Sequence, residues 1–414
     1  MENIEYNNYK ALKKQFAFEY RGISMDRVLA LNIWSWANSK TVKSLLNCIK
    51  FFVAKLDYSF LVGDNKEFIL YSDIPRSDHS ATFCNIADRV QDQYTVFNIK
   101  DGVKKRLDFS IANIFRSISL VSKHIEGGFI RKICYAGYLS MILNTIDSLY
   151  KMSMPQAKRF VAYSIVHETE NLLAQFYRCK GAHVIGLTHG AQFIYKHGIP
   201  LDCINYENLN ADCLVWSQMT KDEYINYGLK GNTLFVAGYP KKVEVKALAE
   251  DSTLKRCLVL LCRKQYDESN VHLLKMLSAF SPEYQFNIKL HPSCDFGYYS
   301  QICGEYGFNL IPKEVLLVDC MDNSKYDFAI AVNTSSYYEI LTAGIPCFRF
   351  DDNGTYDLQN GDEHDCISDS ESFSKALLWL SNAIKDNSYK SIRQQLLQYN
   401  LGIGIDKYRE LLLG

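Results

Sequence analysis

Short apolar runs that alternate with helical patterns most constrain what this chain can fold into. Its second half contains a continuous apolar run at Arg256–Cys262 and three further strand-like segments at Gln285–Leu290, Tyr326–Val332 and Pro346–Phe350. Runs of this kind are typical of parallel strands buried on both faces of a sheet. Helical patterns separate them, and strands that alternate with helices predict a doubly wound α/β sheet.

The rest of the second half fits the same pattern. Phe308–Ile311 and Leu316–Val318 are predicted as short strands, Ser269 as the cap of one helix and Gly344 as the end of another. A final helix is expected at about 389–413, crossing back to the first half.

The first half is less regular but indicates the same class of fold. The predicted strands are Arg27–Ile33, Glu67–Tyr71, Tyr94–Ile99 and His183–Leu187. The predicted helices are Thr41–Leu56 and a long segment from Pro155 to Gly181, with Ser153 as its cap. A chain of 414 residues is long enough for two such domains, and we expect them at 1–212 and 213–414.

Composition excludes several classes of function. The 46 basic and 46 acidic residues leave no net charge, which disfavours a nucleic-acid binder. The 13 cysteines are scattered without a CxxC pair, so we expect reduced thiols and no metal site. No leader-like segment and no apolar run of about 18 residues is present, so we expect a cytoplasmic protein. Thr41–Leu56 is amphipathic and leaves peripheral contact with the inner face of the plasma membrane open, although a core-facing helix is favoured.

Two polar motifs follow directly after predicted strands. Lys289-Leu290-His291-Pro292 follows one strand, and Asn333-Thr334-Ser335-Ser336 follows another. Ligands of open α/β sheets bind beyond the carboxyl ends of the strands, so both motifs fall on the binding edge. The Ser335 and Ser336 hydroxyls at a helix start and the His291 imidazole suit an anion.

Glu339 extends this constellation. It lies four residues after Ser335 and three after Ser336, on the same face of a helix. A carboxylate there can accept both hydroxyls of a ribose beside the phosphate. Lys289 could add charge, but strand side chains alternate, so it could also point away.

These residues resemble the nucleotide domain of GT-B fold glycosyltransferases. The pattern from Glu339 through Gly344 to Pro346 is similar to the wider class, and the HP and SS pair resembles bacterial enzymes that use cytidine-activated donors. Those enzymes include CMP-sialic acid and Kdo transferases and the CDP-glycerol and CDP-ribitol transferases of teichoic-acid synthesis. The resemblance implies two Rossmann-like domains facing a cleft, with donor-phosphate contacts from His291, Ser335 and Ser336 and ribose binding by Glu339. Pro292 and Thr334 belong to the same motifs.

The catalytic base is left open between three residues. His189 follows the predicted strand His183–Leu187, in an HG step that resembles those of the polyol-phosphate transferases. Glu168 and Glu170 interrupt apolar rows of the predicted long helix, and partial desolvation makes a carboxylate a better base near neutral pH. Arg263 and Lys264 follow the first strand of the second domain and could reach the phosphate.

The expected activity is therefore metal-independent transfer of a sugar from a nucleotide-activated donor to a glycan or lipid-linked glycan acceptor in bacterial surface-polysaccharide synthesis. The preferred donor is a CMP-linked 2-keto sugar acid, and no cofactor is expected. A CDP-polyol phosphate transferase and a UDP-sugar 2-epimerase are the alternatives, together with a catalytically silent scaffold.

Overall fold

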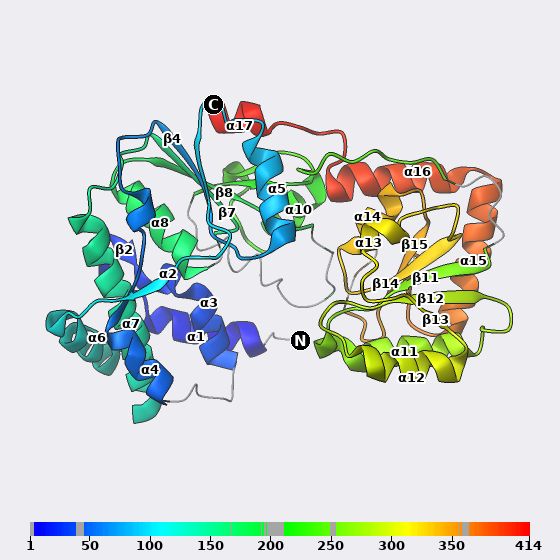
Figure 1. Cartoon of the computed structure of the whole chain (residues 1–414), viewed down its shortest axis with the longest axis horizontal. Coiled ribbons are helices and arrows are strands. Elements are labelled where there is room, and N and C mark those ends of the chain that lie inside the picture. The colour runs from blue at the N-terminus through cyan, green and yellow to red at the C-terminus, as the bar shows by residue number, and fades with distance from the viewer. Residues whose placement is uncertain are drawn as a thin grey trace.

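The fold is described from a computed structural model of the chain, over residues 4–38, 45–165, 167–191, 193, 196, 211–248, 254–355, 357 and 364–414. Figure 1 shows two α/β lobes side by side, with the chain returning from the second lobe to the first at its C-terminal end. No helix in these ranges is both long and apolar enough to cross a membrane.

The first domain is built on a six-stranded parallel sheet of strand order β10-β9-β8-β7-β4-β5. Its strands are β4 (Phe68–Ser72), β5 (Thr95–Asn98), β7 (Arg159–Tyr163), β8 (His183–Leu187), β9 (Asp212–Val215) and β10 (Leu234–Val236). Side chains of β4 and β7 alternate between two cores: Phe160 packs on one face of the sheet, and Leu70 and Val161 pack on the other. This two-residue period, with both faces covered, explains why these strands have continuous apolar sequences.

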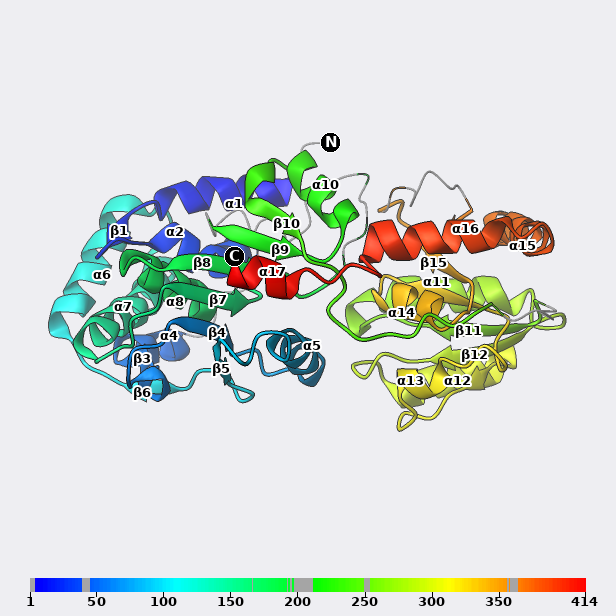
Figure 2. The same cartoon turned by 90° about the horizontal axis from the view of Figure 1, so that it is seen from above.

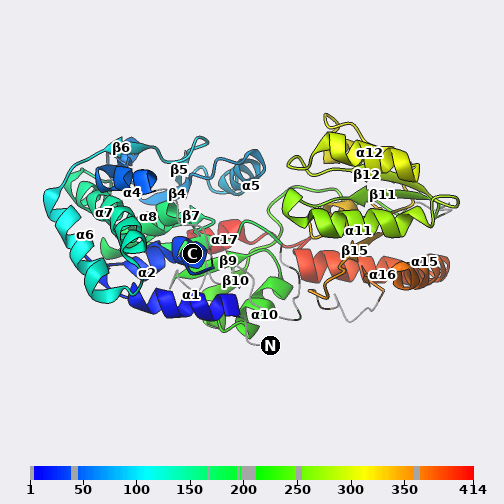
Figure 3. The same cartoon turned by 90° about the horizontal axis from the view of Figure 1, so that it is seen from below.

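Helices cover both faces of the first sheet. They are α1 (Ile4–Gln15), α2 (Met25–Val28), α3 (Ala30–Asn38), α4 (Leu45–Phe52), α5 (Ser77–Ala87), α6 (Ile111–His124), α7 (Phe129–Lys151), α8 (Glu168–Cys179) and α10 (Gln218–Asn226). The domain also contains two small antiparallel strand pairs, β1 (Glu19–Tyr20) with β2 (Ile23–Ser24) and β3 (Ala54–Leu56) with β6 (Lys105–Leu107). It has two 3-10 turns, η1 (Ser59–Leu61) and η2 (Gly231–Thr233). Seen from below, α6 and α7 lie at the end of the lobe far from the second domain (Figure 3).

The second domain repeats the plan with the parallel strand order β13-β12-β11-β14-β15-β16. Its strands are β11 (Arg256–Leu260), β12 (Gln285–Lys289), β13 (Asn309–Leu310), β14 (Phe328–Val332), β15 (Cys347–Phe350) and β16 (Cys366–Ile367). Its helices are α11 (Asp267–Ser278), α12 (Phe296–Tyr306), α13 (Leu317–Cys320), α14 (Ser336–Thr342), α15 (Ser370–Lys385) and α16 (Ser388–Gln395), with the turn η3 (Lys264–Tyr266). Two facing Rossmann-like domains confirm the predicted GT-B class of fold.

The end of the chain joins the two domains. After α16 comes the π-helical segment η4 (Leu396–Leu401), and the chain then crosses to α17 (Tyr408–Leu413) on the first domain (Figure 2). Tyr408 and Leu412 belong to the apolar core of the first domain. Gly238 and Gly402 allow the crossing, since a Cβ at Gly238 would stand 1.8 Å from the Ile405 carbonyl oxygen.

Several local expectations were wrong. Arg27–Ile33 is helical (α2 and α3), because its apolar run packs on one face only, and Leu316–Val318 leads into α13. The expected helix from Pro155 contains strand β7, and Ser153 caps nothing, because the buried run Arg159–Tyr163 pairs with β4 and β8.

Other expected elements have different bounds. Helix α11 begins at Asp267, ahead of the predicted cap Ser269. The expected Thr41–Leu56 helix is α4 followed by β3, with residues 41–44 outside the described ranges. The final helix divides into α16, η4 and α17, and β9 and β10 continue the first sheet past residue 212.

Candidate functional site

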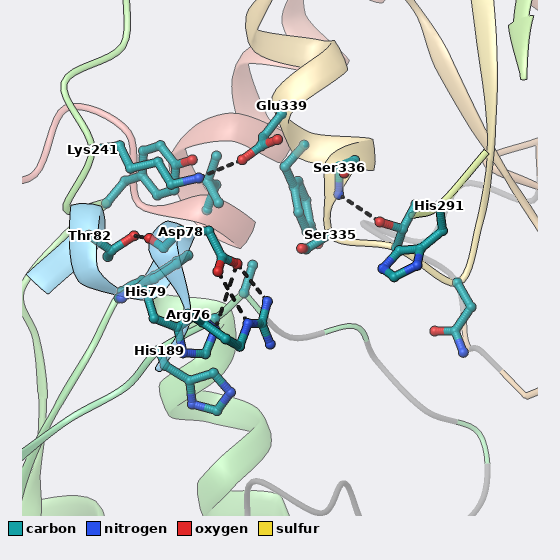
Figure 4. A pocket seen from close by; sticks show the side chains of 18 of the residues that line it. Arg76, Asp78, His79, Thr82, His189, Lys241, His291, Ser335, Ser336 and Glu339 are labelled. Carbon is teal, nitrogen blue, oxygen red and sulfur yellow. Dashed lines mark hydrogen bonds and ion pairs between the residues drawn. The ribbon is translucent and has the colours of Figure 1, made fainter. Parts of the chain in front are cut away.

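A cleft of about 420 Å³ lies between the two domains, within the size range of small-molecule sites. The first domain lines it with Arg76, Asp78, His79, Thr82, His189, Gly190 and Ala191. The segment between the sheets supplies Trp216, Tyr239 and Lys241. The second domain supplies Cys262, Arg263, His291, Asn333, Thr334, Ser335, Ser336, Tyr338 and Glu339, and Leu401 completes the lining. Figure 4 shows the labelled side chains approaching this space from both sides.

His291 lies just beyond β12 with its ring orientation fixed. Its Nδ1 accepts the backbone N–H of Ser293 at 3.1 Å and lies 2.9 Å from the Ser293 hydroxyl. An Nδ1 that accepts carries no proton, so the neutral ring is protonated at Nε2. Partial burial, then Arg263 and Arg76, lower the pKa of His291 below its usual value. At neutral pH this residue is thus a neutral imidazole with a directed N–H donor.

The turn after β14 presents two free hydroxyls. Asn333 has a left-handed φ of 36°, which turns the chain sharply from strand to helix. The backbone N–H of Ser336 donates to the Thr334 hydroxyl at 3.3 Å. Within the described part of the chain, the hydroxyls of Ser335 and Ser336 have no hydrogen-bond partner, and Ser335 makes no side-chain cap. Because α14 spans two turns only, these two hydroxyls suit an anion better than the N-terminus of the helix does.

The buried side-chain amide of Asn270 fixes the backbone just before Arg263, beyond the carboxyl end of β11. Asn270 is fully buried, accepts the backbone N–H of Cys262 at 3.0 Å and donates to its carbonyl at 2.9 Å. The following residue, Arg263, enters the cleft, and no described residue forms an ion pair with its guanidinium. It is therefore a cation available to a ligand.

Glu339 lines the cleft but is already engaged. Its Oε1 accepts from the Lys241 ammonium at 2.6 Å, in an ion pair that is about one-third exposed on each side. The carboxylate beside it helps to raise the pKa of Lys241 against the lowering effect of burial. Lys241 thus orients Glu339 and leaves its second oxygen for a ligand.

His189 follows β8 and lies on the first-domain side. Its Nδ1 is 3.0 Å from the hydroxyl of buried Ser164, which follows β7. Ser164 has a φ of 53°, a strained conformation for a residue with a side chain. If the hydroxyl accepts the Nδ1 proton, the lone pair of the neutral ring lies on Nε2.

The start of α5 contributes an ion pair and a second histidine. Arg76 contacts Asp78 through Nε at 3.2 Å and Nη2 at 2.5 Å, and both side chains are 54% exposed. The rings of His79 and His189 are 5.1 Å apart. Burial, then His189 and Arg76, lower the pKa of His79 to about 4, so His79 is neutral at physiological pH.

Not every predicted site residue reaches this cleft. His189, Arg263, His291, Thr334, Ser335, Ser336 and Glu339 do. Lys289 and Pro292 line a separate small pocket on the other side of His291, in keeping with strand alternation, and Lys264 lies in the turn η3.

Glu168 and Glu170 are also absent from the cleft lining. Glu168 is within 3.4 Å of the Asn32 amide, and Glu170 is fully buried. Burial, then the neighbouring Asp73 carboxylate, raise the pKa of Glu170 well above its usual value. A carboxyl group kept protonated in this way suits sharing a proton with Asp73 rather than accepting one from a substrate.

The sequence prediction missed Arg76, Asp78, His79 and Lys241. Arg76 and His79 come four and seven residues after the end of β4, so strand-end position alone gives only a weak signal. Lys241 directly follows the Gly238-Tyr239-Pro240 turn between the sheets, and its role depends on a contact with Glu339 that is remote in sequence. No group of three His, Cys, Asp or Glu side chains suited to a metal occurs among the described residues.

Comparisons with known proteins extend to the fold only. No protein-family model matches the chain, and no curated protein matches its sequence. Similar solved structures include the apo form of the lipopolysaccharide outer core galactosyltransferase WaaB, 14% identical, covering 84% of this chain and 97% of that one, with a TM-score of 0.46. The UDP-GlcNAc 2-epimerase from Neisseria meningitidis bound to UDP-GlcNAc is 10% identical, with coverages of 85% and 98% and a TM-score of 0.46. The crystal structure of the GtfA/B complex is 12% identical, with a TM-score of 0.42. The match covers 67% of this chain and only 60% of the length of that neighbour.

Proposed function

We propose that this protein is a glycosyltransferase that binds a nucleotide-activated sugar in the cleft between its domains. One observation carries the proposal: the Arg263 guanidinium, the His291 Nε2–H and the hydroxyls of Ser335 and Ser336 converge from three neighbouring strand ends. Cationic and hydroxyl donors gathered at the carboxyl edge of a parallel sheet suit a phosphate.

We further propose a CMP-linked 2-keto sugar acid as the donor. The cleft lining holds three cations, Arg76, Lys241 and Arg263, and two carboxylates, Asp78 and Glu339. The net charge of this lining does not separate the candidate donors, because a CMP-linked 2-keto sugar acid carries one negative charge on its phosphate and one on its carboxylate, as many as a nucleoside diphosphate sugar. The HP and SS motifs are what favour a cytidine nucleotide.

The reaction follows from the two sides of the cleft. The acceptor hydroxyl attacks the anomeric carbon and gives its proton to His189, while the bond from that carbon to the phosphate oxygen breaks. The electron pair of this bond goes to the departing CMP, whose phosphate gains negative charge. His291, Ser335 and Ser336 donate to that charge as it develops, which stabilises the transition state more than the ground state.

The ribose and the acceptor take the remaining positions. The second oxygen of Glu339, oriented by Lys241, is placed to accept the ribose hydroxyls next to the phosphate. The acceptor is a glycan or lipid-linked glycan of a bacterial surface polysaccharide, held on the side of His189.

A thermal-shift screen tests this function. CMP should raise the melting temperature more than UMP, UDP or GDP, because a ligand that binds only the folded state stabilises it. A response to UDP or GDP without one to CMP would overturn the cytidine assignment. Conversion of a UDP-N-acetylhexosamine without any acceptor would identify an epimerase, and no response to any nucleotide would remove the proposed function altogether.

A further inference from the structure

The ion pair at the start of α5 faces the phosphate-binding groups of the other domain. Arg76 and Asp78 line the same cleft as His291, and Figure 4 shows the pair on the opposite side of it from His291. Arg76 precedes α5 and therefore belongs to the first domain, whereas Arg263 belongs to the second. The charges of both arginines lower the pKa of His291, so both cations lie within electrostatic range of this ring.

The Arg76–Asp78 pair costs little to open. Both side chains are more than half exposed, and ion pairs at this level of exposure contribute at most about 1 kcal/mol. The Lys241–Glu339 pair in the same cleft is more buried, with each side chain about one-third exposed. Of the two paired cations in the cleft, Arg76 is thus the one that can change partner readily.

Asp78 has a second partner within reach. The Nε2 atom of His79 lies 3.9 Å from Asp78 Oδ2, just beyond hydrogen-bond distance. His79 is 9% exposed, and its Nδ1 is buried without a partner in the part of the chain that is described. A carboxylate released by Arg76 can therefore turn to the His79 Nε2–H and does not lose all its contacts.

We propose that Arg76 is the first domain's ligand for the donor's phosphate and that it exchanges Asp78 for the phosphate when the donor binds. A guanidinium can bind phosphate oxygens through two parallel N–H donors, as that of Arg76 binds the Asp78 carboxylate in this structure. The donor is then held between arginines of both domains. This inference rests on the proposed function, since it concerns the same donor.

The test compares each nucleotide with its own nucleoside. Titration calorimetry is carried out with CMP, UMP, CDP and UDP, and the tightest of them is compared with cytidine or uridine. Arg76→Gln should weaken the nucleotide about tenfold and leave the nucleoside unchanged, since a hydrogen-bonded charge pair to the phosphate is lost. Asp78→Asn should strengthen the nucleotide a few-fold because Arg76 is no longer neutralised, and this gain should vanish in the double variant.

Arg131→Gln is the matched control. It removes one positive charge from an exposed position on α7 that does not line the cleft, and it should leave nucleotide affinity unchanged. Should Arg76→Gln bind the nucleotide like the wild type, or should Asp78→Asn change nucleotide and nucleoside alike, the Arg76 assignment is wrong while the proposed function stands. A wild type that binds no nucleotide overturns both.

Discussion

The two sides of the cleft differ in how their polar groups are used before any ligand arrives. In the second domain, the hydroxyls of Ser335 and Ser336 and the guanidinium of Arg263 have no partner among the described residues. In the first domain, Arg76 is paired with Asp78, and His189 contacts Ser164. Hydrogen-bond donors without a protein partner suit the binding of an anion. Donors that already have a protein partner either are oriented by that partner or must release it before they can bind a ligand.

This difference predicts two kinds of mutant. Changes at His291, Ser335, Ser336 or Arg263 should lower activity and leave stability nearly unchanged, because the last three have no partner among the described residues and His291 is held only by its own turn. Changes in the first domain should affect orientation, pH dependence and stability together.

The largest effect is expected for His291→Ala. Turnover should fall about a hundredfold or more, the usual loss for one preorganised donor to a developing negative charge. The melting temperature should hardly change, because the ring is only partly buried and its hydrogen bonds to described residues are with Ser293 in its own turn. Steady-state kinetics beside a melting curve measures both.

His272→Ala is the control for that experiment, since His272 is an exposed histidine of the same domain paired with Asp352 outside the cleft. If His291→Ala keeps near-normal turnover or unfolds, His291 has a structural role. The proposed difference between the two sides of the cleft would then be wrong.

A smaller effect on turnover is expected for substitutions of Ser164. Two of them distinguish the orientation of the His189 ring from the backbone strain at Ser164. Ser164→Ala and Ser164→Gly both remove the hydroxyl that holds His189, so both should lower turnover about tenfold through loss of one hydrogen bond to the base. Only glycine accepts the left-handed φ without strain, so Ser164→Gly should be more stable than Ser164→Ala by about 1 kcal/mol. The same activity as wild type in both variants would show that His189 needs no such partner.

The smallest effect on activity is expected for Glu170→Gln. Glutamine resembles the protonated acid, and Glu170 does not line the cleft, so turnover should stay within about threefold of the wild type. A turnover loss as large as that of His291→Ala would restore Glu170 as the base.

Stability should respond to pH at this position. Folding raises the pKa of Glu170 well above its usual value of 4.5. The protonated side chain therefore contributes its full share to the free energy of unfolding below pH 4.5, and this share is lost as the pH rises toward the folded-state pKa. The wild type should therefore lose stability relative to Glu170→Gln between pH 5 and 8, as melting curves at each pH would show. Parallel curves would contradict a protonated Glu170. Glu168→Gln, at the start of the same helix, is the matched comparison.

Sequence reasoning succeeded where chemistry follows a strand directly. His291, Ser335 and Ser336 come at most four residues after segments that were predicted as strands and are strands, β12 and β14, so their place at the sheet edge followed from the fold class. The same reasoning failed for Arg159–Tyr163, since a five-residue apolar run beside a proline fits a strand or a helix equally well, and pairing with β4 and β8 decides it.

The first-domain half of the site depends on contacts that no local pattern encodes. Arg76 directly precedes helix α5 and His79 lies in its first turn, and Lys241 meets Glu339 across 98 residues of chain. The full burial of Glu170 depends on how α8 packs against the rest of the domain, so a carboxylate on an amphipathic helix could be read as a surface group or as a base.

The return of the chain end to the first domain also constrains the order in which the protein can be completed during synthesis. Tyr408 and Leu412 pack in the core on one face of the first sheet, the Tyr94 hydroxyl donates to the Leu412 carbonyl at 2.5 Å, and Arg409 pairs with Asp92. The ribosome makes these residues after the whole second domain, whereas it makes the strands that they cover before that domain. The second domain can therefore close its own sheet before residues 408–414 exist. The first domain precedes the second in the chain but completes its core after it, once residues 408–414 have been made.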